Sequence, residues 1–238
     1  MNPAPPVTHA LANFTVSPLS PEQWEKAVLP REFYQGDTVE VAKKLLGKLL
    51  VRRLPEGDVA VRLCEVEAYL GVADPAAHTA FGRRTPRNEV MWGDGGHLYV
   101  YLTYGMHHCA NVVTRHPGDP QAVLLRGAVA VWGQDHILAR RGGKGEMNGP
   151  AKLCQALALD RTLNGYDLTV AGEVFLADDG ISVSFENVLV LPRVGVEYAG
   201  EAASWPLRFL VRGFPGVKSA SAGAGARPPA PRGARKPR

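Results

Sequence analysis

Short segments of alternating or continuous apolar residues, and not long amphipathic helices, dominate the hydrophobic pattern of this chain. Residues 48–54 and 59–70 are rich in β-forming residues and flank Pro55-Glu56-Gly57-Asp58, a turn signal that predicts a hairpin. A second hairpin is predicted around Tyr104-Gly105. The segments expected to be strands are 48–54, 59–70, 97–103, 107–113, 121–131, 168–177, 181–191 and 207–211.

Helical spacing is confined to short segments, predicted at 21–29, 38–46, 132–141 and 150–159. The clearest is the second, where Asp37 or Thr38 caps the start and Gly47 occupies the left-handed position that ends a helix. Because strands and helices do not alternate as βαβ units, the pattern predicts an α+β fold with a largely antiparallel sheet.

Composition narrows the class of protein. The chain has 238 residues, of which 45% are hydrophobic and 21% charged, as in an ordinary globular domain. We expect no membrane span, because no apolar run approaches about 18 residues. The first 16 residues lack the pattern of a secretory signal. Cys64, Cys109 and Cys154 are odd in number and widely spaced, which argues against a disulfide framework or a thiolate zinc site and favours the cytoplasm.

The net charge of +4 is unevenly distributed. Residues 218–238 contain six Lys or Arg residues and no acid, so residues 1–217 hold 21 basic and 23 acidic residues. The composition predicts a loosely ordered lead-in over 1–30, a folded domain over 31–217 and a basic, disordered Pro/Ala/Gly/Arg tail over 218–238. Such a tail either adds salt-sensitive affinity for a polyanion or only improves solubility.

Two acids lie close together on the predicted strand 59–70. Side chains alternate on a strand, so Glu65, Glu67 and Tyr69 share one face, opposite an apolar face that includes Val66. Residues two apart on a strand are separated by roughly 6.5–7 Å, which resembles the acid–base separation of an inverting glycosidase. The alternative is a half-exposed strand that turns its acids toward water.

Tyrosines are concentrated in the second hairpin. Tyr99 and Tyr101 share a strand face, where aromatic residues are common. Tyr104 is unusual, because it stands at the predicted tip, where Gly, Asn or Asp is typical. An aromatic ring on a rigid tip suits a wedge between stacked bases, whereas a ring folded back onto the sheet has only a packing role.

Residues 76–88 form a loop that carries His78 with Arg83, Arg84 and Arg87, as expected of a loop that faces an anion or, alternatively, only solvent. No spacing of His and Cys residues typical of a metal site is present. The cations that would form a phosphate-facing strip, if they share a surface, are Arg83, Arg84, Arg87, Lys152, Arg193, Arg208 and Arg212.

Taken together, these motifs resemble the alkyladenine-type 3-methyladenine DNA glycosylase family, in family order over about residues 33–216. Each motif is weak alone, but the ordered set is specific. The motifs are 65–71 (EVEAYLG), 76–78 (AAH), 85–88 (TPRN), 98–101 (LYVY), 104–106 (YGM), Asn111, 123–126 (VLLR), 149–157 (GPAKLCQAL), 193–196 (RVGV) and 206–209 (PLRF).

The resemblance implies a single α+β domain with a mixed, largely antiparallel, curved sheet flanked by helices and a protruding β-hairpin. It implies a monofunctional base-excision repair enzyme that hydrolyses the N-glycosidic bond of alkylated or deaminated purines, such as 3-methyladenine, 7-methylguanine, hypoxanthine and ethenoadenine. The expected partner is double-stranded DNA. The expected protein is a monomer that needs no cofactor or metal, and a bacterial one would associate with the nucleoid.

The same resemblance implies roles for seven residues. Glu67 matches the general base that activates water, and Arg126 matches a residue beside that water. Tyr69, His78 and Tyr101 match the pocket that sandwiches the everted base, and Asn111 matches the position that disfavours the amino group of guanine. Tyr104 matches the side chain that fills the gap in the duplex. His107-His108, after Met106, is a feature that the resemblance does not explain.

Two other classes of function remain open from the sequence. One is a nucleic-acid-binding module of the same fold without catalysis. The other is a carbohydrate hydrolase that uses Glu65 and Glu67, although the tryptophans, which often line sugar sites, are scattered at 24, 92, 132 and 205. Release of a free base from lesion-containing DNA separates the glycosylase from both.

Overall fold

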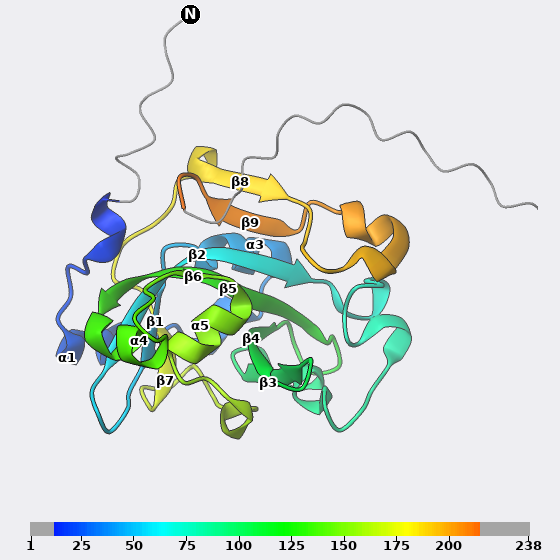
Figure 1. The fold of residues 1–238 in the computed structure, drawn as a ribbon. Coiled ribbons are helices and arrows are strands. Elements are labelled where there is room, and N and C mark those ends of the chain that lie inside the picture. The colour runs from blue at the N-terminus through cyan, green and yellow to red at the C-terminus, as the bar shows by residue number, and fades with distance from the viewer. Residues whose placement is uncertain (1–11, 215–238) are drawn as a thin grey trace, which may run out of the picture.

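A computed structural model describes residues 12–214 as one α+β domain built around a curled antiparallel sheet (Figure 1). The main path of the sheet is β3-β4-β5-β2-β1-β7, and all strand pairings within the described residues are antiparallel. The strands are β1 (Leu49–Arg52), β2 (Val59–Tyr69), β3 (Leu98–Thr103), β4 (His107–Thr114), β5 (Gln121–Trp132), β6 (Met147–Asn148), β7 (Val174–Ala177), β8 (Val188–Leu191) and β9 (Arg208–Val211). The predicted fold class is confirmed.

Strand β2 organises the sheet because it pairs with three other strands. It pairs along most of its length with β5, while its other edge pairs first with β1 and then, over 65–67, with β9. The register between β2 and β5 shifts on both sides of Glu65, as at a β-bulge. Bulges bend and twist a strand, which fits the curl of the sheet around the carboxyl-terminal half of β2.

The helices are short and pack around the sheet. They are α1 (Pro21–Trp24), α2 (Arg31–Tyr34), α3 (Thr38–Leu45), α4 (Gln134–Arg140) and α5 (Pro150–Ala156). The predicted cap of α3 is confirmed, because the Asp37 carboxylate accepts hydrogen bonds from the backbone N–H groups of Val39 and Glu40. Gly47 has a φ of +86°, as expected just beyond a helix end. No helix within residues 12–214 is long and apolar enough to cross a membrane.

The amino-terminal segment differs from the loosely ordered lead-in expected over 1–30. Phe14, Trp24 and Leu29 are buried against the domain. The Arg62 guanidinium donates to the carbonyl oxygens of Phe14 at 3.0 Å and Val16 at 2.7 Å, which fixes the chain before α1. Residues 1–11 and the predicted tail, 218–238, lie outside the described residues.

Two predicted strands are shorter than the hydrophobic pattern indicates. Of 168–177 only the last four residues are strand, because the Asp167 carboxylate accepts a hydrogen bond from the N–H of Thr169 and holds a turn there. Of 181–191 only 188–191 are strand. Asp179 pairs with Arg62 inside the core. This pairing holds the chain in a position where the residues before 188 do not form strand hydrogen bonds with a neighbouring strand.

The other differences lie at the ends of elements. The predicted helix 132–141 begins at Gln134, because Trp132 ends β5 and Gly133 has a φ of +71°. A Cβ at Gly133 would overlap the carbonyl oxygen of Asp58. The predicted helix 150–159 ends at Ala156. Strand β6 and helix α2 are not predicted by the hydrophobic pattern. The segment 71–96 contains 3₁₀ turns at Gly71–Ala73, Ala80–Gly82 and Glu89–Trp92.

Both faces of β2 are buried, so its acids do not point to solvent. Glu65 is 4% exposed and Glu67 is 0% exposed. The interpretation of this strand as half-exposed is therefore wrong. A buried carboxylate is costly unless it is paired and hydrogen-bonded, so the partners of these two acids show what the site is built to hold.

Candidate active site

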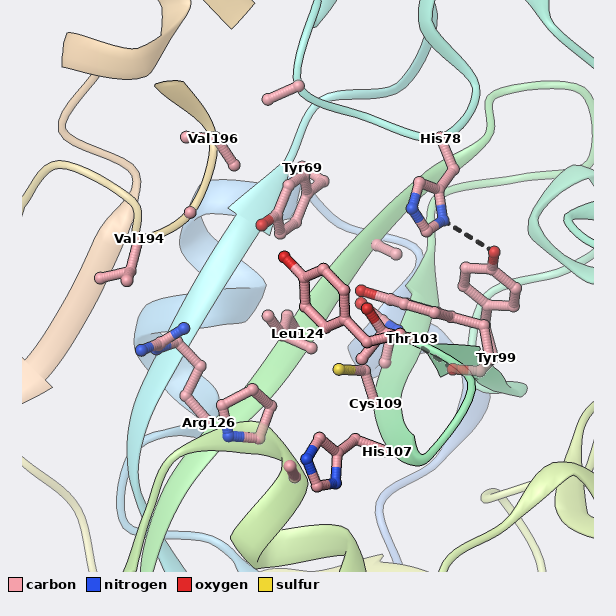
Figure 2. Close-up of a pocket in the computed structure, with 18 of the residues that line it drawn as sticks. Tyr69, His78, Tyr99, Thr103, His107, Cys109, Leu124, Arg126, Val194 and Val196 are labelled. Atoms are coloured by element: carbon pink, nitrogen blue, oxygen red, sulfur yellow. Dashed lines mark hydrogen bonds between the residues drawn. The ribbon is translucent and has the colours of Figure 1, made fainter. Parts of the chain in front are cut away.

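A cavity of about 400 Å³ opens where the end of β2 faces the β3–β4 hairpin. Its volume falls within the range of pockets that hold small organic molecules, about 300–1,000 Å³. Figure 2 shows Tyr69, Val194 and Arg126 on one side of the cavity and His78 with Tyr99 on the opposite side. The residues predicted for the site that line this cavity are Tyr69, His78, Tyr101, Tyr104, Asn111 and Arg126.

Glu67 lies directly behind the cavity wall, and three residues of that wall hold its carboxylate. The N–H of Val194 donates to Oε1 at 2.9 Å, and the Tyr69 hydroxyl donates to Oε2 at 3.0 Å. Arg126 Nη1 lies 3.4 Å from Oε1. Within the described part of the chain, Oε2 accepts only the Tyr69 bond, so the group can still accept a proton or another hydrogen bond there.

Burial and charge act on the pKa of Glu67 in opposite directions. Burial raises the pKa above that of an ordinary glutamate, and the Arg126 charge and the hydrogen bonds from Val194 and Tyr69 partly oppose this shift. A carboxylate whose pKa is raised is a stronger base than a solvated one. Strongly perturbed carboxylates beside a cavity are candidates for acid–base chemistry.

Glu65 has a different environment from Glu67. Its Oε1 lies 3.1 Å from Arg126 Nε and 3.3 Å from Arg208 Nη1, so two guanidinium groups share this carboxylate. Glu65 thereby holds Arg126 in place between the two acids. Because both groups are nearly buried, this pair positions Arg126 more firmly than a surface ion pair would.

The wall opposite Tyr69 is aromatic. The ring centroids of His78 and Tyr101 are 4.6 Å apart, and those of Tyr99 and Tyr101 are 5.4 Å apart. His78 Nδ1 and the Tyr99 hydroxyl form a hydrogen bond of 2.8 Å (Figure 2). Burial, together with the charges of Arg87 and Arg83, lowers the pKa of His78 to about 4, so the imidazole is neutral at pH 7. The His78 ring is therefore uncharged, and it stands edge-on to Tyr101 at an interplanar angle of 69°.

Each of the two tyrosine walls also carries an arginine. The guanidinium of Arg193 lies 4.7 Å from the centroid of Tyr69, and that of Arg87 lies 4.9 Å from the centroid of Tyr101. Arg193 is buried and paired through both ends with Asp74, with Nη2 and Oδ1 2.8 Å apart. Neither contact is predictable from the sequence, because each joins residues that no local pattern connects.

Asn111 is buried at the back of the cavity. It lies on β4 opposite Tyr99 on β3, and its Nδ2 donates to the Tyr99 carbonyl oxygen at 3.1 Å. That bond fixes the orientation of the amide, whose remaining hydrogen-bonding capacity is available to a molecule in the cavity.

Tyr104 stands at the tip of the hairpin and is 89% exposed. Tyr104 and Gly105 have φ values of +50° and +70°, and the Met106 N–H donates to the Thr103 carbonyl oxygen at 3.2 Å. Positive φ at both central residues is typical of a type I′ turn, which here presents the ring outward. The alternative of a ring folded back onto the sheet is wrong.

The seven cations considered for a phosphate strip do not form one surface. Arg193 is buried, Arg208 pairs with Glu65, and Arg84 pairs with Glu89. Among residues 12–214, no group of three or more His, Cys, Asp or Glu side chains is arranged to hold a metal ion.

The chain is similar over most of its length to one family of known proteins. A family model described as methylpurine-DNA glycosylase (MPG) matches residues 32–215. Three curated relatives carry the name "Putative 3-methyladenine DNA glycosylase". The relative from Methanocella arvoryzae is 45% identical over 200 residues, which are 82% of this chain and 98% of the relative. The relative from Bdellovibrio bacteriovorus is 45% identical over 186 residues (78% and 95%), and that from Bacillus cereus is 44% identical over 200 residues (79% and 97%).

Proposed function

This chain belongs to the methylpurine-DNA glycosylase family, and we propose that it excises alkylated or deaminated purines from double-stranded DNA. The proposed substrates are 3-methyladenine, 7-methylguanine, hypoxanthine and ethenoadenine. We assign this activity to residues 31–217. The observation that carries the proposal is the fully buried carboxylate of Glu67, held directly behind the wall of a cavity lined with aromatic rings.

A base inside a duplex cannot reach this cavity, so the damaged nucleotide must rotate out of the helix. Its lost stacking and pairing cost a few kcal/mol, less for a damaged pair. In the proposal the outward ring of Tyr104 fills the gap in the duplex. The everted purine lies between Tyr69 on one side and His78 with Tyr101 on the other, and Asn111 disfavours the amino group of undamaged guanine.

Hydrolysis then requires one water molecule and one base. In the proposed step, a water held near Arg126 gives a proton to Glu67 as its oxygen bonds to C1′ of the sugar. The C1′–N bond breaks, and the purine leaves with the electron pair. The Glu67 charge also stabilises the cationic sugar that develops in the transition state. The Val194 and Tyr69 hydrogen bonds keep the carboxylate pointed at this wall.

We propose hydrolysis without strand cleavage. Schiff-base chemistry needs an amine nucleophile, and among the described residues no lysine lines the cavity. The carbohydrate alternative is disfavoured for a related reason. Glu65 is shared by two arginines and lies beneath the surface, so it does not offer the second free carboxyl group that an inverting glycosidase uses.

The test is release of free base from duplexes that each carry one of the four lesions, with no metal added and with an undamaged duplex as control. The proposal predicts that damaged bases are released and that abasic sites accumulate without strand breaks. Binding of lesion DNA without release of any base would overturn it in favour of a binding module.

A further inference from the structure

A second hollow, of about 700 Å³, lies between the β3–β4 hairpin and α5. Figure 1 shows α5 packed beside this hairpin. The polar side chains that line this hairpin–helix groove are those of His107, His108, Arg141, Lys152, Gln155 and Asp160. The groove adjoins the base cavity, because His107 and Ala151 line both.

The two permanent cations of the groove have no acidic partner within the described residues. Arg141 donates to the Gln155 Oε1 at 2.6 Å and to the Glu146 carbonyl oxygen at 3.3 Å, and its Nε is buried without a hydrogen-bond partner. Lys152 Nζ donates to Asn148 Oδ1 at 2.6 Å. Neighbouring arginines behave differently, since Arg140 pairs with Glu56.

One carboxylate, Asp160, also lines the groove. Hydrogen bonds from Thr162 hold its pKa below the usual range, so Asp160 is ionised at neutral pH. Two cations therefore face one anion, which leaves a net charge of +1 before the histidines are counted. His107 and His108 line the same groove, and an imidazole N–H can donate a hydrogen bond to an anion. The sequence motif His107-His108 thus lies where it would strengthen an anion site.

We propose that the hairpin–helix groove binds the phosphate backbone of duplex DNA beside the hairpin tip. This inference rests on the proposed function, because the outward ring of Tyr104 marks where the duplex lies. His107 begins β4 directly after the turn that carries Tyr104, so a backbone that crosses the tip passes within reach of the groove. Arginine and lysine are the side chains that most often contact phosphate.

The first test measures the affinity for an undamaged duplex as a function of salt. Replacing a phosphate contact reduces the slope of log affinity against log salt by about 0.9. The double variant Arg141→Gln/Lys152→Gln should lower the slope by about two and weaken binding at least tenfold at low salt. Lys44→Gln is the matched control, because Lys44 is exposed on α3, which Figure 1 places on the other side of β2 from α5.

Charge-conserving variants separate lost contacts from a disturbed fold. Arg141→Lys/Lys152→Arg should keep the wild-type slope, since the number of cations is unchanged. A Gln double variant that folds, as judged by its melting temperature, and binds with the wild-type slope would overturn the proposal.

The second test removes the imidazoles. His107→Ala/His108→Ala should weaken binding of the undamaged duplex at constant salt, because an imidazole N–H can donate a hydrogen bond to a phosphate oxygen. An affinity equal to that of the wild type would show that the histidines do not contact the backbone.

These experiments fail independently of the proposed function, because they use undamaged DNA. If the wild type releases damaged bases while both groove variants bind DNA normally, only the proposal that the groove binds the phosphate backbone is contradicted. A wild type that binds DNA through the groove but releases no base would contradict the glycosylase and leave the groove intact.

Discussion

At the scale of the residue, two guanidinium groups lie against the rings that would stack on an everted base. Arg193 lies over Tyr69 and Arg87 lies over Tyr101. A ring face attracts a cation through its quadrupole, and a ring that already binds one cation attracts a second less strongly. The pocket is therefore less favourable for a positively charged alkylated purine than two free tyrosines would be. Neutral purines such as hypoxanthine are not affected in this way.

We expect Arg87→Gln to shift substrate preference toward charged lesions. The ratio of kcat/KM for 7-methylguanine to that for hypoxanthine should rise about two- to fivefold, the equivalent of an exposed cation–π contact of about 0.5–1 kcal/mol. Arg83→Gln removes the same charge from the same loop without a ring contact in the structure, so it is the control. A ratio that stays constant or falls in Arg87→Gln would contradict this account.

The raised pKa of Glu67 predicts how the rate depends on pH. A cationic purine leaves without a general acid, so the pH dependence of its excision reports only the protonation state of the proposed general base, Glu67. Because burial raises the pKa of Glu67, the carboxylate is lost at a higher pH than in a solvated glutamate, and single-turnover excision of 7-methylguanine should fall as pH drops through that value. The folded state binds this proton more tightly than the unfolded state, so protonation itself favours folding.

His78 should not contribute to the same profile, because its pKa is lowered to about 4 and it stays neutral above pH 5. The midpoint of the acid limb should therefore be the same in His78→Gln as in the wild type. A rate that stays constant down to pH 4.5, or a midpoint that moves in His78→Gln, would show that another group controls the step.

At the scale of the element, a substitution at the tip of the β3–β4 hairpin should change DNA affinity without changing the stability of the fold. Tyr104 is almost fully exposed, so Tyr104→Ala should leave the melting temperature unchanged. The variant should bind lesion DNA about tenfold more weakly, because stacking of one base on an aromatic ring contributes about 1–3 kcal/mol. Tyr104→Phe keeps the ring and should bind like the wild type. Equal affinities for Ala and Phe variants would exclude a wedge role.

The elements that the sequence predicted correctly are those fixed by local signals. Asp37 caps α3 within its own turn, and Pro55-Glu56-Gly57-Asp58 joins β1 to β2. The errors occur where a distant partner decides. The apolar segment 181–191 has the pattern of a strand, but only residues 188–191 form one. The chain just before this segment is held by the pairing of Asp179 with Arg62, which lies more than a hundred residues earlier in the sequence.

In the candidate site, too, some residues were predictable from local motifs and other features depend on distant partners. Glu67, Tyr69, His78 and Tyr101 could be named because their motifs match a family, and the structure gathers them at one cavity. The stacking of Arg87 and Arg193 on these rings could not be predicted, because Arg193, for example, is held beside Tyr69 by its tertiary pairing with Asp74. Burial of both faces of β2 was equally hidden, since alternation along a strand does not show what covers each face.

At the scale of the whole molecule, one buried ion pair joins the amino-terminal segment to the sheet. Arg62 Nη2 and Asp179 Oδ2 are 2.7 Å apart, both side chains are fully buried, and Arg62 also bonds to the carbonyl oxygens of Phe14, Val16 and Gly47. Arg62→Leu should lower the free energy of unfolding by about 3–5 kcal/mol, because it leaves the Asp179 charge buried and unpaired.

Urea denaturation checks this prediction. The double variant Arg62→Leu/Asp179→Leu should recover part of the loss, since no unpaired charge remains. As a comparison, Arg53→Ala removes a partly exposed pair with Glu25 and should cost less than about 1 kcal/mol. A single Arg62 variant as stable as Arg53→Ala would contradict the assigned role of the pair.

The curled sheet brings the residues of the candidate site together from separate elements. Glu67 comes from β2, Arg126 from β5, and the aromatic rings from the β3–β4 hairpin and the 71–96 segment. The most direct test of the account compares Glu67→Gln with the wild type in single-turnover base release and in affinity for the same lesion duplex. We expect the affinity to stay within about threefold and the rate to fall by about 10²–10⁴-fold, the usual contribution of a general base. A Glu67→Gln variant that releases the base at close to the wild-type rate would contradict the account.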